Sequence, residues 1–370
     1  MGHNAPMEIQ RSTRDPEVLR AGLETWLATR LEPEASPRVA ELAATSSNGM
    51  SSETVVFDAE WAEHGTRSAH PLVARVAPSA HDVPIFPNYD LGGQFEIIRI
   101  MGERTRVPVP ATFWFEPDPG PIGAPFFVMG RVEGVVPPDL MPYTFGDNWL
   151  YDAAPADQRR LEESTVATLA AIHGLPLDAQ TASLLAYPEA GSTPLTRHLA
   201  HTRAWYEWAV GDGPRAALID EGLDWLETNL PTDEGDAVVS WGDSRIGNII
   251  YSDFEPAAVL DWEMVGIGPR ELDVAFLINA HDVFQHIAQN FELAGMADFL
   301  RAQDVVDAYR GATGHEVGHL DWHLTYAAVR FGIAFVRTGQ RQVHFGEIEA
   351  PESLDDLMHH KGLLAARLGH

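Results

Sequence analysis

The spacing of apolar and polar positions changes near residue 135, which predicts two parts of different architecture. In the first part, Thr54–Asp58 and Leu72–Val76 are short apolar or alternating runs separated by turn residues, and they predict an antiparallel pair of strands. Apolar residues between Asp90 and Arg104 recur at helical spacing, and further strands are expected at Ala111–Glu116 and Phe126–Val132. The predicted order is strand, strand, helix, strand, strand.

The second part consists mainly of long segments with helical periodicity. We expect helices at Asp157–His173, Leu195–Val210, Arg215–Leu230, 269–282, 302–313, 319–339 and 353–368. A short β-rich region interrupts them at Ala237–Trp241, Asn248–Tyr251 and Ala257–Asp261. We therefore predict an α+β fold with two lobes joined near Met129–Pro138. The expected domains are a helical extension at 1–40, a β-rich lobe with one helix at 41–133, and a mostly helical lobe at 134–370.

Composition narrows the classes of partner. The 370 residues include 25 basic and 54 acidic ones, a formal net charge of −29, which disfavours nucleic acids and anionic membranes and remains compatible with cationic small molecules. Lys361 is the only lysine, and the absence of cysteine excludes disulfides, thiolate zinc sites and cysteine nucleophiles. The sequence shows neither a signal-peptide pattern nor an apolar run long enough for a membrane helix, so a cytoplasmic protein is expected.

Residues 238–275 carry the clearest chemical pattern. Asp243 follows an apolar strand, Asn248 comes five residues later, and Asp261 ends the next apolar strand beyond a turn. Phosphoryl transfer from a nucleotide needs one acid to accept the hydroxyl proton and oxygen ligands from two positions to hold Mg²⁺ on the phosphates. The three residue types in this order suit that chemistry.

This segment resembles the aminoglycoside phosphotransferase family, which is related to protein kinases. The resemblance rests on D-x-x-x-x-N, on the apolar strand that ends in Asp261, and on GIGPRELDVAFLI with Asp273 in its helix. It extends from about Ser46 to Gly346. The stretches LVARVAP, VPVPATFWFEPDPGPIGAPFFVMGRVEG and RTGQRQVHFGEIE resemble the actinobacterial and acyl-CoA-dehydrogenase-associated branch of that family.

The resemblance implies a bilobal protein-kinase-like fold, with nucleotide binding in the first lobe and catalysis and acceptor binding in the second. It implies that Asp243 is the catalytic base, that Asn248 and Asp261 are metal ligands, and that Asp273 supports the catalytic loop. The implied cofactors are ATP and Mg²⁺. The implied partner is a small molecule with a hydroxyl group, an aminoglycoside or a related and possibly cationic metabolite, and not a nucleic acid or a membrane.

Two positions depart from the family pattern. The family usually has a histidine two residues before the catalytic aspartate, where this chain has Trp241. Protein kinases place a lysine on the third strand, where LVARV offers Arg75, whose guanidinium can also hold phosphate oxygens. The helix residue that orients it is Glu96 or, in another register, Gln94, and charge favours Glu96.

Other nucleotide contacts are expected at a flexible turn and at the connection between the lobes. The turn Ser46–Ser52, which includes Ser47, Asn48 and Gly49, has the small residues that allow close approach of backbone to phosphate. The adenine is expected to bind backbone in the Met129–Val132 connection, which includes Arg131.

Three other interpretations stay open. The first is a kinase-like pocket that binds a nucleotide or metabolite without phosphoryl transfer. The second is a zinc hydrolase built on HEVGH, with His315 and His319 as ligands and Glu316 as base, although neighbouring glycines disfavour a helix there. The third, a serine hydrolase using Ser244, lacks a downstream Asp-x-x-His.

The roles of several further residues are left open. Glu263 either assists the metal or caps the turn or pairs with an arginine. His173 is expected to be a structural residue at the C-terminal end of its helix rather than a catalytic base. Other residues are expected to be structural or to face the second substrate: Trp205, Tyr206, Trp208, His281, Asp282 and His286.

Overall fold

The computed structural model describes residues 14–42, 53–78, 83–139 and 142–370. The chain divides into two compact units, the first formed by residues 1–95 and 111–131 and the second by residues 96–110 and 132–370. The division falls within helix α2 (Leu91–Arg104) and again after Arg131. Within the described ranges, none of the helices combines the length and the apolar character needed to span a membrane.

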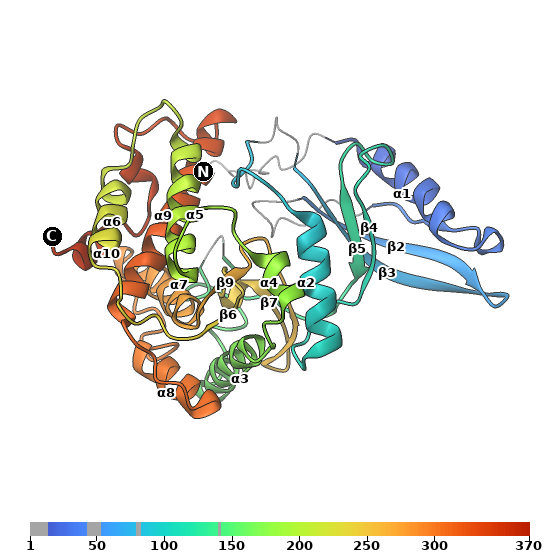
Figure 1. Ribbon diagram of the computed structural model, residues 1–370. Helices are drawn as coiled ribbons and strands as arrows, with labels where there is room; N and C mark the ends of the chain where they lie inside the picture. Colours follow the sequence, from blue (N-terminus) through green and yellow to red (C-terminus); the bar gives the residue numbers. More distant parts are fainter. Residues whose placement is uncertain (1–13, 43–52, 79–82, 140–141) are drawn as a thin grey trace, which may run out of the picture. The chain divides into compact units, whose positions relative to one another are not determined.

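The first unit is built on a five-stranded antiparallel sheet, of which β2, β3, β4 and β5 are labelled in Figure 1. The spatial order of its strands is β1-β2-β3-β5-β4. The strands are β1 (Arg38–Val39), β2 (Glu53–Glu63), β3 (Thr66–Val76), β4 (Thr112–Glu116) and β5 (Phe126–Gly130). This sheet and the largely helical second unit confirm the α+β fold class expected from the sequence.

The hairpin β2–β3 is longer than predicted. The sequence suggested that strand structure ends at Asp58 and resumes at Leu72, but pairing continues to a turn at His64 and Gly65. Both turn residues have positive φ, 51° and 82°, which suits the tight turn of a two-residue hairpin. Alternate residues of β2 remain buried up to Trp61, so one face of the strand contributes to the core over almost its whole length.

Helix α1 (Pro16–Arg30) belongs to the core of the first unit. Asp15 caps its N-terminus, and its apolar face packs in the same cluster as buried residues of β2, β3 and β5. The indole Nε1 of Trp26 donates a hydrogen bond of 2.8 Å to the Glu116 carboxylate at the end of β4. Helix α1 therefore groups with the sheet in the first unit, and residues 96–110 group with the second unit.

The second unit contains eight helices in the described ranges besides the end of α2. They are α3 (Pro155–His173), α4 (Ala179–Leu185), α5 (Pro194–Val210), α6 (Ala217–Thr228), α7 (Glu271–Asn290), α8 (Ala302–Thr313), α9 (Leu320–His344) and α10 (Lys361–Leu368). Helix α7 packs along α9 and is buried over most of its length (Figure 1). The expected C-terminal helix is interrupted, because a 3₁₀ turn at Leu354–Leu357 precedes α10. Lys361, at the start of α10, pairs with Asp356 at 2.6 Å.

Two small antiparallel ribbons lie among these helices. One pairs β6 (Ala237–Ser240) with β9 (Gly266–Pro269), and the other pairs β7 (Ile249–Ser252) with β8 (Glu255–Val259). The sequence indicated the strand at β6 and the β7–β8 hairpin but not β9, a four-residue strand that contains two glycines and a proline. The loop from β6 to β7 contains Asp243.

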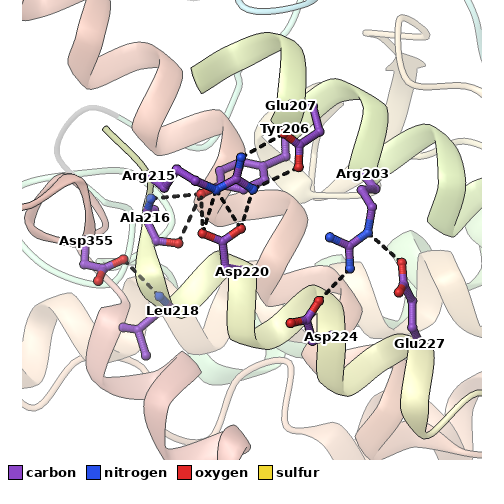
Figure 2. A network of polar contacts seen from close by, with 10 residues as sticks. All are labelled: Arg203, Tyr206, Glu207, Arg215, Ala216, Leu218, Asp220, Asp224, Glu227 and Asp355. Carbon is purple, nitrogen blue, oxygen red and sulfur yellow. Dashed lines mark hydrogen bonds and ion pairs between the residues drawn. The ribbon is translucent and has the colours of Figure 1, made fainter. Parts of the chain in front are cut away.

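A polar network joins α5 to α6 (Figure 2). Arg215 donates to the carboxylates of Glu207 and Asp220, and Arg203 donates to Glu227 and Asp224. The Tyr206 hydroxyl accepts from the backbone N–H of Ala216 and donates to its carbonyl. Leu218 N–H donates to the Asp355 carboxylate, so the network also reaches the 3₁₀ turn.

Candidate active site

The loop that carries Asp243 passes very close to the chain beyond Asp261. Gly242 has a φ of +93°, and a Cβ at this position would lie 2.0 Å from the carbonyl oxygen of Met264. Only glycine is compatible with both the backbone conformation and this contact. The loop then closes through the 3₁₀ turn η3 (Ile246–Asn248), which leads directly into β7. Asp243 is thus held between two fixed strands.

Two neighbours in the same loop hold the carboxylate of Asp243. Asn248 Nδ2 donates to Asp243 Oδ2 at 2.7 Å and to its backbone carbonyl at 3.0 Å, and Arg245 Nε donates to Oδ1 at 3.1 Å. The side chain retains 16% of its exposure. Burial raises the pKa of Asp243 above its usual value, while Arg245 and Asn248 oppose that rise. The carboxylate is therefore fixed in position and made more basic than a solvated one.

Arg245 is itself held by a second carboxylate that the sequence analysis did not single out. Its Nη1 forms an ion pair with Asp139, which lies in the segment between β5 and α3. A Cβ on Gly247 would lie 2.4 Å from Asp139 Oδ1, so glycine at 247 is what allows Asp139 to approach. The spacing of Arg245 two residues after Asp243 was visible in the sequence. Asp139, by contrast, belongs to no motif or periodic pattern in the sequence.

Asn248 and Asp261 lie at the same end of the β7–β8 hairpin. Ile249 pairs with Val259, and the next backbone hydrogen bond runs from Leu260 N–H to Asn248 O at 2.8 Å. Because Asn248 Nδ2 is engaged by Asp243, its amide oxygen is the atom left to bind a ligand. An amide oxygen and a carboxylate are hard oxygen donors of the kind that Mg²⁺ prefers, so these residues fit the expected ion.

Asp273, in the first turn of α7, holds the backbone of the loop that carries Asp243. This completely buried carboxylate accepts hydrogen bonds from Trp241 N–H at 2.7 Å, Gly242 N–H at 2.8 Å and Ser240 Oγ at 3.0 Å, and His173 Nε2 lies 2.9 Å away. Burial alone opposes ionisation, but the hydrogen bonds from His173, Gly242 and Trp241 lower the pKa of Asp273 below its usual value. These contacts give Asp273 the supporting position expected from the resemblance.

Arg330 on α9 reaches the same loop from another direction. It is 4% exposed, and its Nη1 donates to the carbonyl of Gly242 at 3.2 Å. Its guanidinium lies over the rings of Phe276 and Tyr326 at 5.6 Å from each centroid. No sequence pattern pointed to Arg330, because it is a single arginine in a long helix.

The residues expected to bind nucleotide lie mainly in the first unit. Arg75 is on β3, where its Nη1 donates to Thr54 Oγ1 on β2 at 2.8 Å. Met129 lies in β5, in register with Val73 on one side and Thr112 on the other, so the sheet engages its backbone. Arg131 follows this strand; its side chain pairs with Asp58 at 3.1 Å and its N–H donates to Pro71 O at 3.0 Å.

Glu96, the helix residue expected to orient Arg75, forms an ion pair within its own helix. Glu96 accepts hydrogen bonds from Arg99 one turn later, at 2.9 Å for Nε, and this contact lowers the pKa of Glu96. Gln94, the alternative, is 5% exposed. The expected phosphate turn, with Ser47, Asn48 and Gly49, lies outside the described residues.

Residues 56–312 match the phosphotransferase enzyme family, over more than two thirds of the chain. The chain belongs to this family. The match includes Asp243, Asn248, Asp261 and Asp273.

Two curated relatives link this family member to acyl-CoA dehydrogenases. The probable acyl-CoA dehydrogenase IBR3 of Arabidopsis thaliana is 27% identical over 259 residues, which cover 66% of the chain and 30% of the relative. Human acyl-CoA dehydrogenase family member 11 is 30% identical over 170 residues, or 45% of the chain and 20% of the relative. The chain therefore spans less than a third of the length of these relatives. They confirm the expected likeness to acyl-CoA-dehydrogenase-associated phosphotransferases.

Solved structures share the fold of this phosphotransferase family member. A putative aminoglycoside phosphotransferase from Ralstonia eutropha JMP134 superimposes with a TM-score of 0.63 at 21% identity, over 96% of this chain and 97% of that one. Macrolide 2'-phosphotransferase type I gives 0.56 at 16% identity, over 92% and 100%. A thermostable mutant of aminoglycoside phosphotransferase APH(4)-Ia, in a ternary complex with ADP and hygromycin B, gives 0.55 at 14% identity, over 94% and 98%.

The HEVGH segment of this family member does not have the geometry of the helical zinc motif. Residues 314–319 connect α8 to α9 without helical structure, so the two histidines do not share a helix face. His315 Nε2 instead lies 2.8 Å from the buried carboxylate of Glu271, and Gly318 N–H donates to the same oxygen at 3.1 Å. In the part of the chain that the structure describes, no group of three or more histidine or carboxylate side chains is placed to hold a metal ion.

Several residues that could have faced the second substrate are instead buried or held by contacts with neighbouring residues. Tyr206 is completely buried and its hydroxyl is engaged by Ala216, and Trp205 is 4% exposed. His281 Nδ1 lies 3.0 Å from the Tyr143 hydroxyl, and burial lowers the pKa of His281 to about 4. Asp282 pairs with Arg367 of α10 at 2.9 Å. Trp208 is 37% exposed and stacks with Arg337, so it alone of these five presents an open aromatic surface.

Two other residues left open by the sequence analysis also have structural surroundings. His286 packs against α10, where a Cβ atom placed on Gly362 would lie 3.5 Å from His286 Nε2. Ser244 Oγ donates to the Asp273 carbonyl at 2.8 Å and is buried, which does not suit a nucleophile.

Proposed function

We propose that this chain transfers the γ-phosphoryl group of ATP to a hydroxyl group of a small molecule. The observation that carries the proposal is the hydrogen-bonded set of Asp243, Asn248 and Arg245 in one loop, with Asp261 at the end of the hairpin that Asn248 opens. Membership of the phosphotransferase enzyme family supports the reaction type. The arrangement supplies a base and two oxygen ligands, the set that phosphoryl transfer requires.

Asp243 is proposed as the general base. Burial makes its carboxylate more basic, and the contacts with Arg245 and Asn248 keep it oriented, so it can accept the proton of an acceptor hydroxyl as that oxygen attacks phosphorus. Asn248 therefore has two tasks, because its NH₂ group holds the base while its oxygen is proposed to face the metal. This shared use couples the position of the base to the position of the metal ligand.

Asn248 Oδ1 and the Asp261 carboxylate are the residues proposed to hold Mg²⁺. When bound, the ion neutralises charge on the phosphates and fixes their orientation. Arg75 is proposed to hold the phosphates in place of a lysine, with Glu96 as the favoured orienting residue. Backbone at Ser47, Asn48 and Gly49 and at Met129 and Arg131 is proposed to complete the nucleotide site. Structural neighbours form complexes with ADP and with AMP-PNP, which supports an adenine nucleotide.

The acceptor is proposed as a small hydroxyl compound, and two groups of relatives define which compounds to test. The structural neighbours include a complex with hygromycin B and a macrolide 2'-phosphotransferase, whereas the curated relatives are named acyl-CoA dehydrogenases. A panel should therefore contain aminoglycosides, macrolides, amino alcohols, hydroxy acids and hydroxyacyl thioesters of coenzyme A. Phosphorylation is read as a mass gain on the acceptor together with ADP formation.

The decisive comparison is Asp243→Asn against wild type, with Asp253→Asn as the matched control. Asp253 lies in the turn of the β7–β8 hairpin, where its exposed side chain pairs only with Arg160 among the described residues. Asp243→Asn should lower kcat by roughly 10²–10⁴-fold while ATP still binds, because a missing general base costs about that factor. The control should remain active. Wild-type turnover in Asp243→Asn would contradict the assigned base, and ATP binding without transfer to any compound of the panel would favour the nucleotide-binding alternative.

A further inference from the structure

Asp261 adopts a left-handed backbone conformation, which few residues other than glycine adopt. Its φ is +57°, in the left-handed region where residues other than glycine are uncommon. Such a conformation persists only where the surrounding structure fixes it. The proposed metal ligand therefore depends on neighbouring groups for its direction.

The indole of Trp241 contacts the peptide groups on both sides of Asp261. Its Nε1 lies 3.0 Å from the carbonyl oxygen of Leu260 and 3.1 Å from the carbonyl oxygen of Asp261, and it donates to both. The first carbonyl belongs to the peptide before the Cα of Asp261 and the second to the peptide after it. One N–H group thus restrains both rotations, φ and ψ, about that Cα.

Trp241 is itself rigidly held. It is 2% exposed, its backbone N–H donates to Asp273 at 2.7 Å, and its ring packs near that of Trp262 with centroids 6.2 Å apart. An indole N–H only donates and does not titrate in the physiological range, so this restraint does not change with pH. A path of direct contacts therefore runs from Asp273 through Trp241 to the backbone of Asp261.

We propose that Trp241 is a positioning residue that sets the direction of the Asp261 carboxylate and thereby the affinity of the site for a divalent cation. The inference rests on the proposed function, since it takes Asp261 as a metal ligand. Trp241 acts from the loop that carries the base, two residues before Asp243. The same segment of chain thus orders both the base and the metal ligand.

The test compares Trp241→Phe with Trp262→Phe. Each substitution replaces a buried indole by a phenyl ring and removes one N–H, but the Trp262 N–H donates to Val259 O at 3.3 Å, outside the two peptides that flank Asp261. The two variants therefore match in lost volume and in the loss of one indole N–H group, but only Trp241→Phe removes the contacts with the peptides that flank Asp261. Binding of Mn²⁺ in the presence of the non-hydrolysable analogue AMP-PNP is measured by electron paramagnetic resonance of the free ion. Hydrogen exchange of peptides covering residues 258–266 is measured in the metal-free chain.

Trp241→Phe should weaken Mn²⁺ binding roughly tenfold, the loss typical when a residue that orients a metal ligand is removed, and should speed exchange in residues 260–263. Trp262→Phe should leave the Mn²⁺ affinity near the wild-type value. Trp241→His, which retains a ring donor, should recover part of the affinity and serves as the second variant if Trp241→Phe folds poorly. Unchanged Mn²⁺ affinity in Trp241→Phe, or an equal loss in Trp262→Phe, overturns the inference.

The result separates this inference from the proposed function. If wild type binds no Mn²⁺ with AMP-PNP, the proposed function fails and the inference about metal affinity fails with it. If wild type binds Mn²⁺ and Trp241→Phe binds it equally well, the inference alone fails. Exchange in residues 260–263 then shows whether Trp241 restrains the backbone without affecting the ion.

Discussion

His173 Nε2 lies 2.9 Å from Asp273 Oδ2, and both side chains are almost completely buried. The two residues are a hundred positions apart, at the end of α3 and in the first turn of α7. The other ring nitrogen of His173 lies 2.6 Å from the Tyr309 hydroxyl on α8. This contact joins three helices to the carboxylate that holds the backbone of Trp241 and Gly242.

Replacing His173 by alanine should destabilise the protein strongly. The substitution leaves the ionised Asp273 buried without one of its hydrogen-bonding partners, and leaving a buried polar group short of a partner costs about 1–3 kcal/mol, more when that group is charged. The free energy of unfolding from denaturant titration measures the effect. His201→Ala is the control, because His201 forms a similar 2.9 Å contact with Glu189 but is 36% exposed, and such a pair contributes about 1 kcal/mol or less. Equal losses in both variants would contradict the role given to His173.

Arg245→Met should impair both catalysis and stability. Its guanidinium lies between Asp139 and Asp243, so its removal leaves two carboxylates without a cation and frees the proposed base. We expect kcat to fall roughly a hundredfold, as for other misplaced catalytic groups. Adding Asp139→Asn should recover stability but not kcat, since it removes only the second uncompensated charge. Arg160→Met, which removes an exposed arginine on α3, should leave kcat unchanged. Recovery of kcat in the double variant would count against the positioning of Asp243 by Arg245.

Arg75→Ala should weaken nucleotide binding. A charge-assisted hydrogen bond contributes about 1.5–3 kcal/mol, which corresponds to a roughly 10–100-fold higher Kd for ATP. Calorimetric titration with ATP and Mg²⁺ measures the change. Arg67→Ala on the same strand is the control, because Arg67 is exposed and faces Glu60 and the Ser36 carbonyl. An unchanged Kd in Arg75→Ala would contradict the proposed role of Arg75 in nucleotide binding.

Stability should fall as the pH decreases from 6.5 toward 4, partly because of His360. Burial lowers the pKa of His360 to about 4, so the folded state holds it neutral while the unfolded chain protonates near pH 6.5. The stabilisation that comes from neutral His360 is therefore fully present above pH 6.5 and is lost on acidification. A pKa shift of this size corresponds to at most about 3 kcal/mol in the free energy of unfolding. Its Nε2 donates to Ala328 O at 2.9 Å, and its buried Nδ1 has no acceptor for a second proton among the described residues.

His360→Gln tests this dependence, because glutamine can retain a donor for Ala328 O without titrating. The free energy of unfolding of this variant should vary less between pH 6.5 and 4.5 than that of wild type. The same substitution at the exposed His344 is the control. A pH dependence identical to wild type in His360→Gln would exclude His360 as a source of the acid sensitivity.

The sequence was informative where chemistry is concentrated in a short segment. Asp243, Asn248 and Asp261 are separated by one turn and one hairpin, so local spacing alone brings them together, and the hairpin register follows from two apolar runs. Asp139 and Arg330 contact the same loop from positions about a hundred and ninety residues apart, and neither belongs to a periodic or motif-like pattern. Such contacts depend on packing between helices, which single-chain patterns do not specify.

Backbone detail was also out of reach of the sequence. Nothing in AVLDWE predicts that Asp261 has a positive φ, because that conformation depends on donation from Trp241, nineteen residues before Leu260 along the chain. Strand β9 was missed for a related reason. Its four residues GIGP have weak strand propensity and are paired because β6 lies beside them.

The position of Lys361 gives the chain a natural labelling site. It is the only lysine in the sequence, its side chain is 53% exposed, and its ion pair with Asp356 is of the exposed kind that contributes little to stability. An amine-reactive fluorophore on this side chain would mark the start of α10 without any substitution. Because the chain contains no cysteine, one cysteine introduced into the first unit would accept a second dye, and energy transfer between the two would test whether the distance between the labelled positions changes when nucleotide is added.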